Sequence, residues 1–349
     1  MEKKTRIALV GAGLVGKRHI AAINELSNIE LAGVVDTDIS AKKIADQNHC
    51  NWYESVDEML TEERINGAVL STPTNLHAKQ AQICVQKDIP VLIEKPITAS
   101  TAEGKELVNT ASARDVPILV GHHRRHNSII QEAKKLINSG SLGSIQAAHF
   151  NCWFYKPDEY FDRAEWRKQD GAGPLSVNLI HDIDLARYLC GEIVCVQAYT
   201  KKSLRGFENE EVAAAVLKFE NGALGSVSVS DRIVSPWSWE LTSKEHPVYP
   251  STDQICYLIG GDKGSLSIPD LKLWYQTGTP DWWQPIKFKH PSIERVDPLV
   301  RQMEHFARVC SGEIKPLVSG MDGLKSLAVI EAIAAAAREK SEVIVGNFI

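Results

Sequence analysis

Residues 7–16 read IALVGAGLVG, an apolar run that ends in three glycines spaced G-x-G-x-x-G. The run has the length and the Val, Ile and Leu content of a buried strand, and residues 14–26 continue in a helical pattern. The alternation recurs as far as residue 121, with LAGVVD before 40–47, GAVLS before 75–87, VLIEK before 101–113, and finally PILVG. Strands that are apolar on both faces and separated by helices are typical of a parallel sheet covered on both sides. We therefore predict a doubly wound α/β domain over residues 1–122.

In this setting the glycine turn predicts a binding site for the pyrophosphate of a dinucleotide. Gly11 permits a tight turn, Gly13 lets the backbone approach the phosphates, and Gly16 lets the helix pack closely on the strand. Leu14 and Val15 open the helix, whose N-terminus would hold the phosphate.

Asp36 lies twenty residues after Gly16, at the end of the second apolar run. A carboxylate at this place accepts hydrogen bonds from the ribose hydroxyls and repels a 2'-phosphate. The sequence therefore favours NAD over NADP. Lys17 and Arg18 lie close enough in the sequence to keep NADP as an alternative.

The pattern changes after about residue 122. Helices are predicted at 127–138, 175–190 and 323–339, and strands dominate between 192 and 290. Asn221-Gly222 separates two alternating runs, 211–219 and 223–231, and this pair is the strongest short signal for a hairpin. We expect residues 123–349 to form an α+β domain with a large, open, mainly antiparallel sheet.

Composition limits the classes of function. With 44% hydrophobic residues and a net charge of -5, the chain has no basic excess that would indicate a nucleic-acid surface. No stretch of ~18 apolar residues predicts a membrane segment. The seven cysteines are scattered and form no C-x-x-C pair, so we expect neither disulfides nor a zinc site, and a cytoplasmic location.

Glu94, Lys95 and Pro96 end the apolar run VLI. Ligands of open parallel sheets bind beyond the carboxyl ends of the strands, so these residues are predicted to face the ligand. The residue before a proline is kept out of helical geometry, which holds Lys95 in an extended conformation.

Six motifs together resemble one known family. They are GAGLVG at 11–16, STPTNLH at 71–77, EKP at 94–96, GHHRRHN at 121–127, Trp166-Arg167, and HDIDLARYL at 181–189. On these residues the chain resembles the glucose-fructose oxidoreductase / inositol dehydrogenase (Gfo/Idh/MocA) family over nearly its full length. The resemblance implies an NAD-dependent oxidoreductase whose second domain packs its sheet against a partner subunit, in a homodimer or homotetramer.

The resemblance also implies roles for individual residues. Lys95 and His181 would be catalytic, flanking a substrate hydroxyl and the nicotinamide. The cofactor would further contact Ser71, Thr72, Pro73, Asn75, His77 and Glu94. The substrate would contact His123, Arg125, Trp166, Arg167, Asn178 and His181, and for Arg125 a structural ion pair is as strongly expected as a ligand contact.

One position departs from the family pattern. Many relatives have an aspartate four residues before the histidine, where this chain has Val177. Asn178 beside it can hydrogen-bond a hydroxyl but cannot accept a proton. We expect His181 to move the proton and Lys95 to polarise and orient the substrate oxygen, because imidazole is mostly neutral at pH 7 and a lysine is not.

The predicted function is hydride transfer between the nicotinamide and a carbinol carbon of a sugar, cyclitol or related cyclic polyhydroxy compound. A dihydrodiol or hydroxy-acid dehydrogenase is an alternative, because Arg124 and Arg125 could meet a carboxylate. A non-catalytic dinucleotide-sensing regulator is another. The histidines at 122, 123 and 126 are not expected to bind metal, and the tryptophans at 237, 239, 282 and 283 are expected in an interface or in loop packing.

Overall fold

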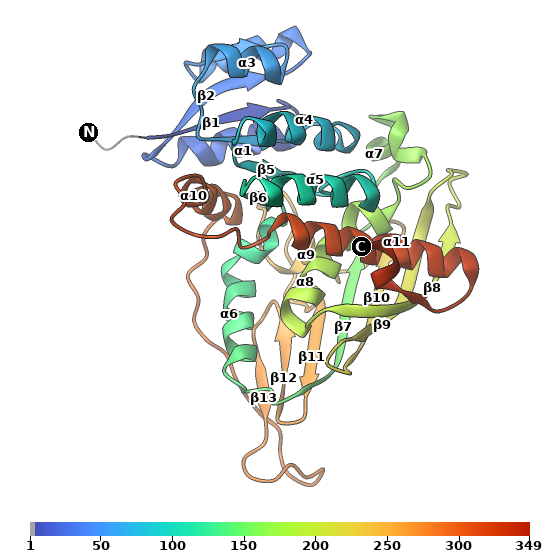
Figure 1. Ribbon diagram of the computed structural model, residues 1–349. Coiled ribbons are helices and arrows are strands. Elements are labelled where there is room, and N and C mark those ends of the chain that lie inside the picture. The colour runs from blue at the N-terminus through green and yellow to red at the C-terminus, as the bar shows by residue number, and fades with distance from the viewer. Residues whose placement is uncertain (1–3) are drawn as a thin grey trace. The chain divides into compact units, whose positions relative to one another are not determined.

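The computed structural model describes residues 4–349 and divides them into two units (Figure 1). The first contains residues 4–126 and 296–327, with Ile349; the second contains 127–295 and 328–348. The sequence assigned everything after residue 122 to the second domain, so the return of residues 296–327 to the first unit corrects that division.

The sheet of the first unit is fully parallel, in the order β3-β2-β1-β4-β5-β6. This is the doubly wound order of dinucleotide-binding folds, with the order reversing between β1 and β4, and it confirms the predicted fold class. The strands are β1 (Thr5–Val10), β2 (Ile29–Val35), β3 (Asn51–Tyr53), β4 (Gly67–Leu70), β5 (Val91–Ile93) and β6 (Ile118–Val120).

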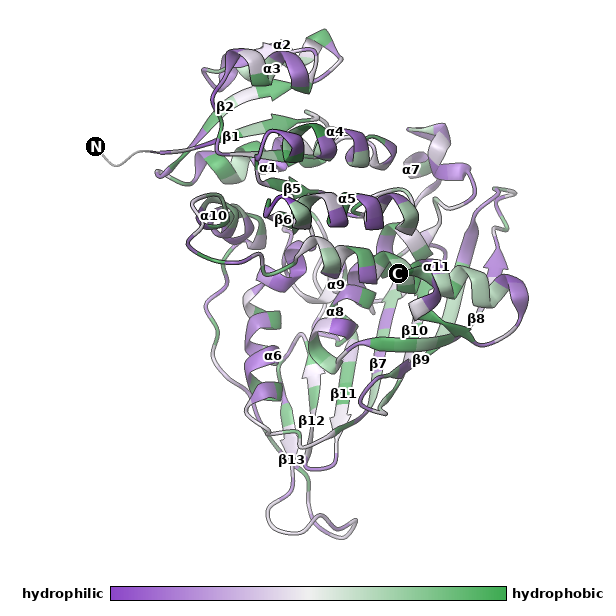
Figure 2. Cartoon of the chain, in the orientation of Figure 1, coloured by the Kyte–Doolittle hydropathy of each residue, from purple (hydrophilic) through white to green (hydrophobic). Residues whose placement is uncertain are grey.

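Helices follow the strands of this sheet in turn. Every residue of β4, β5 and β6 is buried, because helices cover both faces. Figure 2 shows hydrophilic residues along α4 and α5. The helical segments are α1 (Leu14–Asn24), η1 (Ile39–Ala41), α2 (Lys42–Gln47), α3 (Val56–Glu62), α4 (Thr74–Gln86), α5 (Thr101–Ala113), η2 (His123–His126) and α10 (Pro298–Cys310).

Helix α10 was not predicted from the sequence. It is the element through which residues 296–327 join the first unit. The Asp297 side chain caps it by accepting a hydrogen bond from the Leu299 N–H. Its buried face, with Met303 and Phe306, belongs to the core of the first unit. A Cβ at Gly67 would lie 2.9 Å from the Phe306 ring, so the strand needs glycine where this helix packs.

The second unit contains a nine-stranded sheet in the order β14-β13-β12-β11-β7-β10-β9-β8-β15. All its pairs are antiparallel except β7 with β10, which confirms the mainly antiparallel sheet. The predicted hairpin joins β9 to β10. The strands are β7 (Ile145–Trp153), β8 (Ile193–Lys202), β9 (Glu210–Phe219), β10 (Leu224–Ser230), β11 (Tyr257–Gly261), β12 (Gly264–Ile268), β13 (Leu273–Tyr275), β14 (Lys287–Lys289) and β15 (Val343–Ile344).

One face of this sheet is buried by helices and the other is open. On β7, Ala148 and Phe150 are buried whereas His149 between them is exposed, as expected for a strand with one covered face. The helical segments are α6 (Ser128–Asn138), α7 (Asp158–Asp162), η3 (Glu165–Lys168), η4 (Leu175–Leu179), α8 (Ile180–Cys190), α9 (Trp239–Thr242), α11 (Gly320–Glu339) and η5 (Val345–Phe348). The part of α11 before residue 328 belongs to the first unit. Across residues 4–349, none of the helices combines the length and apolar character needed to cross a membrane.

Candidate functional site

The glycine turn joins β1 to α1, and its three glycines meet different surroundings. Gly11 has φ +92°, and a Cβ there would lie 2.8 Å from the backbone of Ser71 and Thr72. A Cβ at Gly16 would lie 2.0 Å from the Gly11 carbonyl oxygen, so that helix and turn touch. A Cβ at Gly13 would meet nothing within 4 Å. The open backbone at Gly13, at the N-terminus of an eleven-residue helix, fits a phosphate group.

Asp36 follows β2 and faces this turn. Its Oδ2 accepts a hydrogen bond of 2.7 Å from the Ala12 N–H, and its Oδ1 accepts one of 2.9 Å from the Asp38 N–H. Each carboxylate oxygen can accept a second hydrogen bond, so the side chain can still take ribose hydroxyls. Asp36 thus sets the shape of the glycine turn and holds a negative charge beside it.

The segment after β4 lies against the same turn. The Ser71 hydroxyl donates to the Gly11 carbonyl at 2.8 Å, and the Thr72 hydroxyl lies 2.6 Å from the side-chain oxygen of Gln80. Pro73 and Asn75 are exposed where α4 begins. Of the predicted cofactor residues here, Ser71 supports the turn, and Pro73 and Asn75 are open to a ligand.

His77 joins two segments of the site through its imidazole. Nδ1 lies 2.9 Å from the Pro96 carbonyl oxygen and Nε2 lies 2.9 Å from the Thr72 carbonyl oxygen. The side chain is buried, and burial lowers the pKa of His77, although the two carbonyl contacts act in the opposite direction. Both nitrogens face carbonyl oxygens, which only accept, and a neutral imidazole donates through one nitrogen, so His77 is hydrogen-bonded to one of these segments and lies in contact with the other. A direct cofactor contact of His77 stays a prediction.

Glu94 and Lys95 follow β5, at the same edge of the sheet as the glycine turn. Glu94 is buried and accepts a 2.8 Å hydrogen bond from Nε2 of His19 on α1. Its other oxygen accepts a hydrogen bond from the Lys95 N–H at 3.2 Å. Lys95 itself is half-buried. Burial is the largest influence and would raise the pKa of Glu94, but the hydrogen bond from His19 and the charges of His19, His123 and Lys95 together outweigh it, and the pKa falls to about 2.

This carboxylate gives a pH-dependent contribution to stability, which His19→Leu tests. The pKa of Glu94 is about 2 in the folded protein and that of an unfolded glutamate is about 4.3. Ionised Glu94 therefore stabilises the fold above about pH 4.5 by on the order of 3 kcal/mol, and this is lost as the pH falls toward 2. We expect His19→Leu to lower the free energy of unfolding by that order at pH 7 and by about half as much at pH 3, measured in urea. An equal loss at both pH values would mean that His19 acts through packing alone.

The histidine- and arginine-rich segment after β6 forms η2. His123 is half-exposed, whereas Arg125 is buried and pairs with Asp322, with 3.4 Å between Nη1 and Oδ1. Nη1 also lies 3.5 Å from the Leu317 carbonyl oxygen. These contacts match the ion-pair alternative for Arg125 and leave His123 as the more accessible of the two. Within residues 4–349, no three His, Cys, Asp or Glu side chains gather as a metal site would require.

In the second unit, a π-helical segment carries Asn178 directly before α8. Such segments are rare and frequently occur at functional sites. Asn178 is 9% exposed, and its Oδ1 accepts no hydrogen bond from any described residue. His181 follows one turn later and is also buried. Asp182 receives a hydrogen bond from the Tyr257 hydroxyl, so it serves the packing of α8 on the sheet.

Trp166 and Arg167 lie on η3. Trp166 is 51% exposed, so its indole is available to a ligand. The Arg167 guanidinium lies 4.1 Å from the centre of the Tyr160 ring and donates to the Tyr160 carbonyl oxygen at 2.6 Å. These contacts hold Arg167 in place and use part of its donor capacity.

Sequence reasoning missed three residues that shape these sites. His19 contacts Glu94, and its only local signal is a histidine on the buried side of α1. Glu210 on β9 accepts a hydrogen bond from the Leu175 N–H at 2.9 Å and so holds the start of the π-helical segment. A Cβ at Gly173 would lie 2.2 Å from the Glu210 carboxylate, which explains the glycine there. No local pattern predicts the last two roles.

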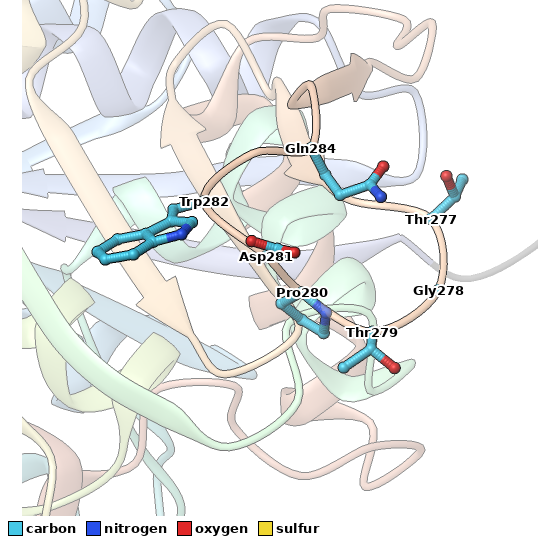
Figure 3. A pocket seen from close by; sticks show the side chains of 7 residues that line it. All are labelled: Thr277, Gly278, Thr279, Pro280, Asp281, Trp282 and Gln284. Carbon is cyan, nitrogen blue, oxygen red and sulfur yellow. The ribbon is translucent and has the colours of Figure 1, made fainter.

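A hollow of about 780 Å³ lies in the loop between β13 and β14 (Figure 3). It is lined by residues 277–282 and 284, which include no histidine, lysine or cysteine, and it contains no predicted site residue. Trp282 and Trp283 are 88% and 83% exposed there, whereas Trp239 is buried and stacks on Tyr257. We assign no catalytic role to this loop.

Comparison with known proteins gives consistent results for both units. The family model described as an oxidoreductase family with an NAD-binding Rossmann fold matches residues 5–122, and the GFO/IDH/MocA C-terminal domain matches residues 130–267. The chain is 24% identical to the D-apiose dehydrogenase of Paraburkholderia graminis, over 97% of this chain and 88% of that protein. It is 27% identical to the rhizopine catabolism protein MocA of Rhizobium meliloti, but over only 54% of this chain and 57% of MocA.

Among solved structures, the WlbA dehydrogenase from Bordetella pertussis, in complex with NADH and UDP-GlcNAcA, is similar over almost the whole chain. The TM-score is 0.79 and the identity 28%, covering 98% of this chain and 99% of WlbA. The similarity thus extends through both units.

Proposed function

Because the chain belongs to the Gfo/Idh/MocA family of oxidoreductases, we propose that it is an NAD-dependent dehydrogenase acting on a carbinol of a sugar, cyclitol or related cyclic polyhydroxy compound. The observation that carries this proposal is the set of groups at one edge of the parallel sheet. The open turn at Gly13, the carboxylate of Asp36 and the Glu94-Lys95 pair all lie at the carboxyl ends of neighbouring strands. Ligands of doubly wound sheets bind at this edge.

The choice of NAD over NADP rests on Asp36. Its carboxylate lies beside the glycine turn, hydrogen-bonded to the Ala12 N–H. A 2'-phosphate would place about two further negative charges near this carboxylate. The two hydroxyls of an unphosphorylated ribose would instead donate hydrogen bonds to it. Lys17 is exposed and Arg18 half-exposed on α1, and among the described residues neither forms an ion pair with Asp36.

Bound NAD would supply the hydride acceptor, and the chain would supply the groups that bind and deprotonate the alcohol. We propose that Lys95 and His181 both act on the proton of the substrate hydroxyl. A lysine with an ordinary pKa is neutral in only about one molecule in two thousand at pH 7, so Lys95 serves best as a donor that polarises the substrate oxygen. An imidazole is mostly neutral at that pH and can accept the proton.

The substrate class follows from the relatives and from Asn178. One relative is named D-apiose dehydrogenase, and the WlbA dehydrogenase structure is a complex with NADH and UDP-GlcNAcA. The buried amide oxygen of Asn178 has no partner among residues 4–349 and can accept a hydrogen bond from a substrate hydroxyl. The amide also carries no charge, unlike an aspartate at the same place.

The open face of the second sheet is the proposed contact with another copy of the chain. Tyr199, Val216, Leu224 and Leu258 lie on this face and are 46–68% exposed. An apolar face of this kind usually marks an interface. Static light scattering of the purified protein tests the proposal, and a mass of 38.6 kDa, that of one chain, would contradict it.

A substrate panel tests the proposed reaction. Purified protein with NAD⁺ is mixed with sugars, cyclitols, dihydrodiols and hydroxy acids, and formation of NADH is followed by absorbance. We expect turnover with a cyclic polyhydroxy compound. Turnover restricted to hydroxy acids or dihydrodiols would replace the proposed substrate class, and tight NAD binding without any turnover would favour a regulatory protein.

A further inference from the structure

A buried carboxylate, that of Glu94, lies at the carboxyl end of β5. Glu94 is 9% exposed and His19, its partner on α1, is completely buried. The two side chains are 75 residues apart in the sequence and meet at 2.8 Å. Burying a carboxylate is costly unless a donor compensates it. The contact with His19 is therefore what allows a charge to be kept at this place.

Contacts from three directions fix the orientation of this carboxylate. His19 binds Oε1, and the Lys95 N–H binds Oε2 at 3.2 Å. From the third side comes the backbone at the end of β6, where a Cβ on Gly121 would lie 2.9 Å from Cδ of Glu94. Glycine at 121 thus leaves room for the carboxylate, which has little freedom to turn away.

The charges around Glu94 also keep it ionised. Burial would raise its pKa, but the hydrogen bond from His19 and the influence of His123 and Lys95 bring it to about 2. His77 on α4 also interacts with the Glu94 charge. As an ionised carboxylate, Glu94 only accepts, so Nε2 of His19 carries the donated proton. Nδ1 of His19 meets no acceptor among the described residues.

The strand order places Glu94 toward the nicotinamide end of a bound dinucleotide. Asp36, directly after β2, would meet the ribose of the adenosine half, and the glycine turn after β1 would meet the pyrophosphate. The rest of the dinucleotide must continue past β4 toward β5, because β3 and β2 lie on the other side of β1. Glu94 follows β5 and is therefore at the part of the edge that the nicotinamide half would reach.

We propose that Glu94, held ionised and oriented by His19, biases the cofactor site toward NAD⁺ over NADH. The two cofactor forms differ by one positive charge on the nicotinamide ring, so a nearby fixed negative charge stabilises the oxidised form selectively. This deepens the proposed function, because it rests on the chain binding NAD. A site that favours NAD⁺ is set for oxidation of an alcohol and for release of the reduced cofactor.

The test measures the dissociation constants of NAD⁺ and NADH by calorimetry, without substrate. In Glu94→Gln the amide oxygen still accepts from His19, but the charge is gone. We expect the ratio Kd(NAD⁺)/Kd(NADH) to rise about tenfold, the order expected for one charge near a partly buried site. His19→Leu should raise the ratio in the same direction, and more strongly at pH 5 than at pH 8, because Glu94 then takes up a proton more easily.

Glu106→Gln is the matched control, since it removes the same charge from an exposed position on α5. Its ratio should equal that of the wild type. If Glu94→Gln leaves the ratio within about twofold, or weakens both forms equally, the proposal is wrong and Glu94 only positions groups. If His19→Leu does not fold, the ratio measured for Glu94→Gln is sufficient to test the proposal. Absence of substrate turnover would concern the proposed function instead, because these measurements need no substrate.

Discussion

Replacing Lys95 with methionine is expected to lower kcat by about 10³-fold or more while the dissociation constant for NAD⁺ stays within about tenfold. Methionine keeps most of the length of the side chain and removes the ammonium group. The groups that would hold the pyrophosphate lie elsewhere, at the open turn around Gly13 and the N-terminus of α1. Steady-state kinetics with the best compound of the panel and calorimetric titration with NAD⁺ measure the two quantities separately.

Lys79→Met on α4 is a suitable control, because Lys79 is an exposed lysine on the same unit. It should leave both quantities unchanged. If Lys95→Met loses NAD⁺ affinity but turns over normally at saturating NAD⁺, Lys95 is a cofactor ligand and not a catalytic residue. The double variant with His181→Ala adds a second check, since two residues that act on one proton should give a combined loss smaller than the product of the single losses.

Asp36→Asn is expected to change the preference between NAD and NADP by about a hundredfold or more. The amide oxygen can still accept from the Ala12 N–H, which keeps the contact with the glycine turn, whereas the amide nitrogen cannot accept from the Asp38 N–H. The negative charge is lost, which removes the repulsion of a 2'-phosphate and weakens the hydrogen bonds with the ribose hydroxyls. Dissociation constants for NAD⁺ and NADP⁺, measured for both proteins, give the change directly.

Asp38→Asn provides the comparison for this experiment. Asp38 is exposed and two residues further along the chain, where its side chain caps η1. Its substitution should alter the preference by less than about threefold. If the wild type binds NADP⁺ as tightly as NAD⁺, Asp36 does not select the cofactor, and Lys17 or Arg18 would be the next residues to replace.

The first unit could largely be predicted because its signals are local. The apolar run IALV and the glycine spacing after it concern neighbouring residues, and the structure shows β1, the turn and α1 in that order. The Asn221-Gly222 hairpin is equally local and is present between β9 and β10. Local backbone preferences suffice for such elements, because few long-range contacts compete with them.

Other features depend on contacts between distant residues. Helix α10 has a good cap at Asp297, yet only packing places its apolar face in the core of the first unit. Arg125 was left open between an ion pair and a ligand contact, and its partner Asp322 lies 197 residues away. The π-helical segment that carries Asn178 is likewise held at its start by Glu210, a residue of strand β9 that accepts a hydrogen bond from the Leu175 N–H.

The sequence by itself determined the parallel fold, the dinucleotide turn and the placement of Glu94 and Lys95 at the end of a strand, because each follows from periodicity or spacing along a short segment. The tertiary structure alone decided that His19 faces Glu94, that Gly121 makes room for its carboxylate, and that both nitrogens of His77 meet backbone carbonyls. Charge and hydrogen bonding at a buried site are properties of groups that only folding brings together.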